Sequence, residues 1–196
     1  LNGLEKLHAI LPLDPKKTNR IIRHSIPDWL DKAGVEAFDE RIWEKELTKQ
    51  NEEALLVLRV NTLKTTPERL QKALASKFNI VSNRIDAYPE ALILEKHLKL
   101  THLEPYQKGL FEIQDANSQL VSHWVDPKPG MKVIDACAGA GGKSLHLAAL
   151  MENKGQIIAT DIYESKLKKL KIRTRRAGVF NVTTKELDST KVIKKM

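Results

Sequence analysis

The 196-residue sequence has few or none of the features that are typical of disulfide-rich, membrane-spanning, secreted or disordered proteins. Its single cysteine, Cys137, excludes a disulfide framework and a cysteine-rich metal site, and is typical of a reducing compartment. No apolar run approaches the roughly 20 residues of a membrane span, and no secretory signal opens the chain. With 41% apolar and 30% charged residues, the composition is neither disordered nor collagen-like. We therefore expect a globular cytoplasmic protein of one domain or two small ones, with no metal and no membrane partner.

The chain carries an excess of positive charge, which is concentrated in residues 161–196. The formal net charge is +8, yet residues 161–196 alone hold 11 basic and 4 acidic side chains. A clustered positive surface is typical of proteins that bind polyanions such as nucleic acid. A lysine-rich helix can equally be a solvated face. Charge alone leaves both interpretations open.

The two ends of the chain resemble cut points more than natural termini. The sequence starts with Leu1 and stops in STKVIKKM (189–196), without the glycine, proline or polar tail that ends a finished element. We expect an internal fragment of a longer protein.

Residues 1–104 show two local patterns. Residues 1–50 are predicted to be a helical linker, with Trp29 and Trp43 among its buried apolar anchors. Residues 51–104 are predicted to be a small α/β module. It has a strand at 54–60, a helix capped by Thr65 or Thr66 with Glu68 placed for a capping box, and strands around Ile80 and at 91–94.

Residues 105–196 have a different pattern of predicted elements. A helix is predicted at 115–125, and strands and helices then alternate. The expected ranges are strand 132–136, helix 144–151, strand 156–160, helix 164–176 and strand 179–184. This alternation predicts the first half of a parallel, doubly wound sheet.

The segment VIDACAGAGGKS (133–144) indicates a ligand site. Its three glycines permit a tight turn and let backbone N–H groups approach a ligand at a helix N-terminus. A phosphate-binding P-loop would need glycine where Cys137 stands, and a dinucleotide fingerprint would need its third glycine spaced differently. S-adenosylmethionine is the third candidate. Asp161, about 20 residues further on at the end of the next strand, favours a ligand that contains ribose.

These segments together resemble one family. DACAGAGGKS (135–144), with FEIQDANSQLV (111–121) before it and ATDI (159–162) after it, is similar to the cofactor motifs of the RsmB/Nop/Sun family. LRVNTLK (58–64) and SIPDWL (25–30) also resemble segments of that family, whose members are S-adenosylmethionine-dependent RNA methyltransferases that make 5-methylcytosine. The family commonly has proline where Ala140 stands, a departure that we expect to affect loop stiffness.

The resemblance implies an α/β fold, in which a helical segment and a small RNA-contacting α/β module precede the first half of a Rossmann-like methyltransferase sheet, residues 105–196. It also implies roles for particular residues. Asp161 would hold the ribose hydroxyls, and Asp188 would accept from the adenine amino group. The loop that would wrap the methionine and ribose comprises Cys137, Ala138, Gly139, Ala140, Gly141, Gly142 and Lys143.

The catalytic step is where the resemblance stops. Methylation of cytosine at carbon 5 needs a thiolate nucleophile, and the family uses two cysteines in proline-cysteine and threonine-cysteine motifs that this chain lacks. Cys137 lies on the cofactor loop and is not expected to be the nucleophile. We therefore expect no catalytic residue in these 196 residues, and no activity from them alone.

The resemblance also implies RNA as the partner, with rRNA first and tRNA next. Candidate phosphate contacts are Lys168, Lys169, Lys171, Arg173, Arg175 and Arg176. Two other functions remain open, a non-catalytic RNA-binding fragment and a P-loop nucleotide-binding protein. If the family's fourth strand lies outside the chain, the strand at 133–136 has an unpaired edge, so we expect self-association.

Overall fold

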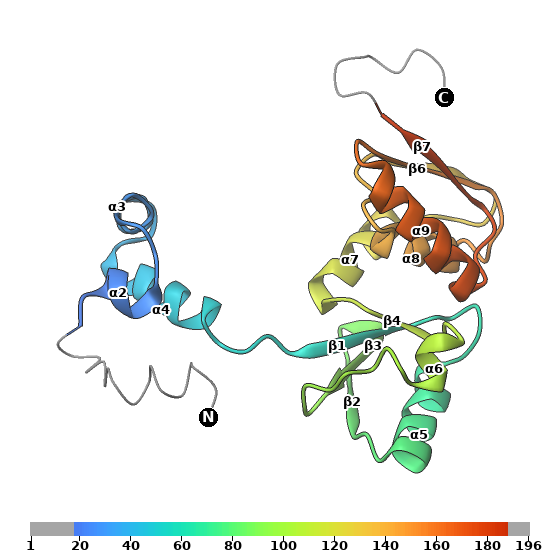
Figure 1. Ribbon diagram of the computed structural model, residues 1–196, viewed down its shortest axis with the longest axis horizontal. Coiled ribbons are helices and arrows are strands. Elements are labelled where there is room, and N and C mark those ends of the chain that lie inside the picture. The colour runs from blue at the N-terminus through green and yellow to red at the C-terminus, as the bar shows by residue number, and fades with distance from the viewer. Residues whose placement is uncertain (1–17, 188–196) are drawn as a thin grey trace. The chain divides into compact units, whose positions relative to one another are not determined.

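The computed structural model describes residues 18–187. The chain divides into two compact units, Leu1–Ala54 and Leu55–Met196, each of which is described separately (Figure 1). Within the described residues, no helix has the length and apolar character that crossing a bilayer requires.

The described part of the first unit, residues 18–54, contains α2 (Arg20–His24), α3 (Asp28–Phe38) and α4 (Glu40–Gln50). Trp43 is its buried aromatic residue, as predicted: the indole Nε1 donates to Asp31 Oδ1 at 2.9 Å, and the ring fills the space beside Gly34. Arg20 forms an ion pair with Asp31 at 2.7 Å, and this hydrogen bond lowers the pKa of the carboxyl group. The prediction for Trp29 was wrong, since this residue is 70% exposed. It lies two positions before Asp31, about 200° around the helix from the face that meets α4.

The second unit begins with a four-stranded antiparallel sheet in the order β2-β3-β1-β4. Its strands are β1 (Leu56–Val60), β2 (Ser82–Ile85), β3 (Tyr88–Leu94) and β4 (Phe111–Ile113). Helix α5 (Pro67–Phe78) packs on β2 and β3, and the short α6 (Glu104–Gln107) leads into β4. Leu58, Leu74, Leu92 and Phe111 are fully buried in the core of this sheet. Strand β4 comes after residue 104, in the range assigned to the cofactor half, yet it pairs with β1.

Two local predictions in this sheet were wrong in detail. The N-cap of α5 is Thr66, whose hydroxyl accepts from the Arg69 N–H, so a capping box between Thr65 and Glu68 does not form. Glu68 instead forms an ion pair with Arg84. Strand β2 starts after Ile80 rather than around it, because the Ile80 N–H still bonds to a carbonyl of the α5 C-terminus.

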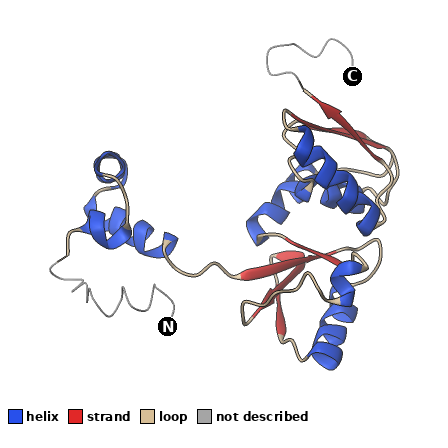
Figure 2. Cartoon of the chain, viewed as in Figure 1, coloured by secondary structure: helices blue, strands red, loops and turns tan. Residues whose placement is uncertain are grey.

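The second sheet is parallel, with strand order β5-β6-β7, and it confirms the predicted fold class. Figure 2 shows its strands as a group separate from the first sheet. The elements are α7 (Ala116–Val125), β5 (Lys132–Asp135), α8 (Gly142–Leu150), β6 (Gln156–Asp161), α9 (Glu164–Ala177) and β7 (Val182–Glu186). Helix α7 contacts β1 and β3 as well as α8, so it joins the two sheets. Strand β7 starts three residues later than predicted, because the Val179 N–H still bonds to the C-terminal turn of α9 after the left-handed Gly178.

Candidate cofactor site

The loop between β5 and α8 has the shape that its glycines predict. Gly139 and Gly141 both have positive φ, +55° and +85°. A Cβ at Gly141 would lie 2.5 Å from Leu170 Cγ, so packing against α9 excludes any side chain there. A Cβ at Gly139 would meet no atom within 4 Å. Gly139 therefore faces open space beside the N-terminus of α8, which no side chain caps.

Asp161 ends β6 and is hydrogen-bonded to this loop. Its Oδ2 accepts from the Gly139 N–H and its Oδ1 from the Tyr163 N–H, both at 2.9 Å. These bonds, led by the one from Tyr163, lower the pKa of the carboxyl group. A carboxylate has about four lone-pair sites, so Asp161 can accept from a further donor. The arrangement places an anionic acceptor next to the open space at Gly139.

Side chains at the ends of β5 and β6 fix the start of the loop. The Thr160 hydroxyl donates to the Ala136 carbonyl at 2.9 Å, and the Ala138 N–H donates to the Thr160 carbonyl at 2.8 Å. The Asp135 carboxylate accepts from the Ser144 hydroxyl in the first turn of α8 at 2.7 Å. The loop is thus held by both strands and by the helix that follows it.

Two arginine side chains also donate to carbonyl groups of this loop. The sequence analysis did not predict this role for either of them. Arg59 of β1 is 3% exposed and donates to the Gly142 carbonyl and to Gln114 Oε1. Burial lowers its pKa to about 10, which leaves it a cation at neutral pH. Arg173 of α9 donates to the Ala140 carbonyl at 2.8 Å. An arginine inside the apolar strand LVLRV was the one sequence signal for this role.

A buried carboxylate on β4 is the counter-ion for part of this cluster. Glu112, whose side chain is 4% exposed, pairs with Arg173 at 2.9 Å and with Arg176 at 2.6 Å. The Arg176 guanidinium also lies 3.9 Å from the centroid of the Tyr106 ring. Arg173 and Arg176 were candidate RNA contacts, and in the structure both guanidiniums pair with the Glu112 carboxylate.

The other residues singled out from the sequence lie in different surroundings. Lys168 is exposed and pairs with Glu164 at 2.7 Å, one turn away on α9. The exposed side chains among the remaining candidates are Lys169, Lys171, Arg175, Lys143 and the Cys137 thiol. Asp188 lies outside the described residues.

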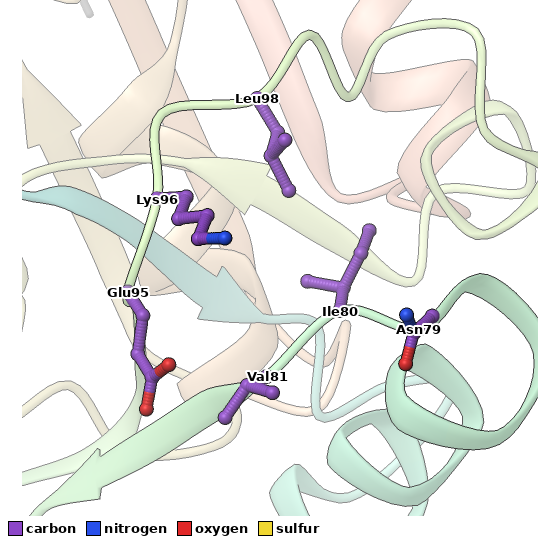
Figure 3. A pocket seen from close by; sticks show the side chains of 6 residues that line it. All are labelled: Asn79, Ile80, Val81, Glu95, Lys96 and Leu98. Carbon is purple, nitrogen blue, oxygen red and sulfur yellow. The ribbon is translucent and has the colours of Figure 1, made fainter.

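The described residues line several surface hollows. One hollow of about 360 Å³ lies in the first sheet, where Ile80 and Leu98 point toward each other (Figure 3). Another, of about 170 Å³, runs along β5 and is lined by Val133, Ile134, Val121 and Lys143. The first is remote from the glycine loop in sequence and belongs to another sheet, whereas the second reaches the loop at Lys143.

Taken together, these features define a class of protein. Parallel strands with a glycine loop after the first and a carboxylate at the end of the second form the ligand-binding half of a Rossmann-like domain. The hydrogen bond from Arg59 of β1 to the Gly142 carbonyl adds a contact that a bare Rossmann unit does not have.

Comparisons with known proteins identify the family. A family model described as 16S rRNA methyltransferase RsmB/F matches residues 122–196, and a model of the RsmF/B-like ferredoxin-like domain matches residues 26–101. The probable ribosomal RNA small subunit methyltransferase B of Synechocystis is 34% identical over 91% of this chain and 40% of its own length. The Bacillus subtilis protein of the same name is 33% identical over 85% of this chain and 37% of its own length.

Solved structures agree with this assignment. A methyltransferase homologue from Pyrococcus horikoshii superposes with a TM-score of 0.76 at 30% identity, over 88% of this chain and 56% of that one. The chain belongs to the RsmB/Nop/Sun family of RNA (cytosine-5) methyltransferases. It spans about two fifths of the length of the two bacterial relatives.

Proposed function

We propose that this chain binds S-adenosylmethionine at the β5–α8 loop and supplies the cofactor-binding half of an RNA (cytosine-5) methyltransferase. The observation that carries the proposal is the pair of hydrogen bonds that tie Asp161 to Gly139 and Tyr163. They hold an ionised carboxylate beside a glycine whose missing side chain leaves room for a ligand.

The residues present fit this cofactor. Asp161 would accept from the two ribose hydroxyls, and the loop from Cys137 to Lys143 would surround the methionine and ribose. Asp188 remains our candidate for the adenine amino group. When bound, S-adenosylmethionine supplies an electrophilic methyl group on its sulfonium. The protein's own contribution is to hold the loop rigid, through Arg59 and Arg173 on its inward carbonyls.

RNA is the proposed substrate, with rRNA before tRNA. The two relatives that cover most of this chain are named as ribosomal RNA small subunit methyltransferases, whereas a Pyrococcus horikoshii relative named as a tRNA (cytosine(72)-C(5))-methyltransferase matches 47% of it. We propose that exposed basic side chains of α9, namely Lys169, Lys171 and Arg175, contact phosphates. Residues 51–104 are proposed as a second RNA-contacting module, after a helical linker at 1–50 and before the cofactor half at 105–196.

The nucleophile is proposed to be a residue other than Cys137. That thiol is exposed on the cofactor loop, where it would face the ligand and not a base. The relatives are more than twice as long as this chain, so we assign methyl transfer to the longer protein that contains it.

Cofactor binding can be tested directly by calorimetry on the chain. Asp161→Asn keeps the shape of the side chain and removes its charge. Hydrogen bonds to charged groups contribute about 1.5–3 kcal/mol, so we expect affinity for S-adenosylmethionine to fall roughly tenfold to a hundredfold. Asp126→Asn, at an exposed left-handed helix cap, is the matched control and should leave the affinity unchanged. A loss under threefold at Asp161 would refute the assignment, and thermal protection by ATP but not by S-adenosylmethionine would favour a P-loop protein instead.

Methyl transfer needs a second experiment, with labelled S-adenosylmethionine and either small-subunit rRNA or tRNA. The chain extended to the length of its relatives should label rRNA at cytosine, and the 196 residues alone should label neither RNA. Labelling of tRNA but not rRNA would reverse the substrate order. RNA binding with no transfer by the extended protein would favour a non-catalytic RNA-binding protein.

A further inference from the structure

Three ionisable side chains from three elements meet in the interior of the second unit. They are Glu90 of β3, His123 of α7 and His146 of α8, and one ligand atom from each lies within 4.8 Å of the others. His123 Nε2 is 2.7 Å from Glu90 Oε2, and His146 Nε2 is 3.6 Å from the same oxygen. The two imidazole rings meet edge to face, with centroids 5.2 Å apart. Nothing in the sequence pattern pointed to this cluster, and we had expected no metal site.

His146 is the unusual member. It is 1% exposed, and within residues 18–187 neither of its ring nitrogens has a hydrogen-bond partner. A buried polar group without a partner costs about 1–3 kcal/mol, so such groups are rare and call for an explanation. A metal ion that accepts the Nε2 lone pair would satisfy one of these two nitrogens. The Nε2 atom already faces a carboxylate and a second imidazole.

We propose that Glu90, His123 and His146 bind one divalent transition-metal ion, with zinc as the best fit. Imidazole nitrogen and carboxylate oxygen are the donors that zinc takes from non-cysteine sites. Bond lengths of about 2.0–2.2 Å around a tetrahedral ion place neighbouring donor atoms about 3.3–3.5 Å apart. The two printed separations from Glu90, 2.7 and 3.6 Å, lie on either side of this value, and all three donor atoms lie within 4.8 Å of one another. Three protein donors leave the fourth position to water.

The access to the cluster supports this proposal. His123 also lines a surface hollow of about 220 Å³, which gives an ion a path from solvent.

One nearby charge opposes a cation. Burial lowers the pKa of His146, Arg59 lies close enough to lower it further, and Arg59 is itself buried. Glu112 and Glu90 both favour the charged form of Arg59, and the Glu90 carboxylate is the anionic ligand that attracts the ion. A bound ion would connect the first sheet, through β3, to the helix that follows the glycine loop.

The test is metal titration of the untagged, chelator-treated chain, by calorimetry with zinc and by visible absorption with cobalt. We expect one ion per chain, and a rise in melting temperature on adding zinc. Glu90→Gln, His123→Gln and His146→Gln should each weaken zinc binding at least about tenfold, because each removes a ligand. His102→Gln, an exposed histidine outside the cluster, is the matched control and should bind zinc like the wild type. Cys137→Ser should also bind normally.

The outcomes separate the proposal from its alternatives. No zinc binding by the wild type would show that the cluster is a hydrogen-bonded network without an ion. Binding that survives in the three cluster variants, or that is lost in Cys137→Ser, would place the ion elsewhere and overturn the proposal. If His146→Gln does not fold by circular dichroism, His123→Gln decides, since that side chain is 29% exposed and tolerates change better.

Discussion

Glu112 should be among the most sensitive positions in the second unit, although it touches no proposed ligand. Its buried carboxylate pairs with Arg173 and Arg176, and its charge also favours the cationic form of Arg59. Glu112→Gln keeps the size of the side chain and leaves those guanidiniums without their shared counter-ion. The perturbation therefore tests charge compensation and not packing.

The expected magnitude follows from the burial of the pair. Breaking a buried ion pair by removing one partner costs about 3–5 kcal/mol, because the remaining charge is uncompensated. Glutamine keeps one carbonyl acceptor, so we expect the free energy of unfolding to fall by an amount at the lower end of this range, about 3 kcal/mol. With a urea m-value of about 1–3 kcal/mol per M, the unfolding midpoint should fall by at least about 1 M. Affinity for S-adenosylmethionine should also fall, since Arg173 holds the Ala140 carbonyl of the loop.

The assay is urea unfolding followed by far-ultraviolet circular dichroism, with Glu104→Gln as the control. Glu104 pairs with Lys108 on the exposed side of α6, and its loss should leave the midpoint unchanged. Adding Arg176→Gln to Glu112→Gln should cost less than the sum of the single changes, because it removes one of the uncompensated cations. A loss of stability below about 1 kcal/mol for Glu112→Gln would refute the reasoning.

Three further predictions concern other parts of the chain. Replacing Lys169 and Lys171 with glutamate should weaken RNA binding by the extended protein and flatten its salt dependence, by a slope of about 0.9 per lost phosphate contact; an unchanged slope would mean a solvated face. Ile134 is 51% exposed on β5, whose second edge has no partner strand among residues 18–187, so Ile134→Lys should reduce self-association in sedimentation. A monodisperse wild-type monomer would contradict this. The first unit should lose stability as the pH falls below the ordinary value of 3.8 for Asp31, because its lowered pKa favours the folded carboxylate. Asp31→Asn should remove this pH dependence in the fluorescence of Trp43, and a dependence that persists would assign it to another group.

Several features were predictable because their causes are local. A helix cap such as Thr66 or Asp115 acts on an N–H three residues away, and Gly178 ends α9 because glycine adopts a positive φ without strain. The alternation of apolar strands with helices, and the glycines before α8, likewise leave a pattern within a few residues. The sequence by itself therefore determined the α/β class, the cofactor loop and Asp161 as the acid beside it.

The burial of individual side chains was less predictable. Trp124, which shares an apolar pattern with Leu120, is 79% exposed, whereas Gln119 and Ser122 form the buried face of α7. That face contacts β1 and β3, so its identity depends on where the first sheet lies. Periodicity shows that a helix has two faces, but the neighbouring elements decide which one is covered.

Tertiary structure alone decided how the charged residues are used. Glu112 and Arg173 are 61 residues apart in the sequence, and Arg59 and Gly142 are 83 apart. Glu90, His123 and His146 come from three separate elements. No local pattern records such pairs, because the chain positions only meet once both sheets have formed. The basic side chains of α9 therefore divide, in the folded chain, into exposed ones such as Lys169, Lys171 and Arg175, and Arg173 and Arg176, which pair with Glu112.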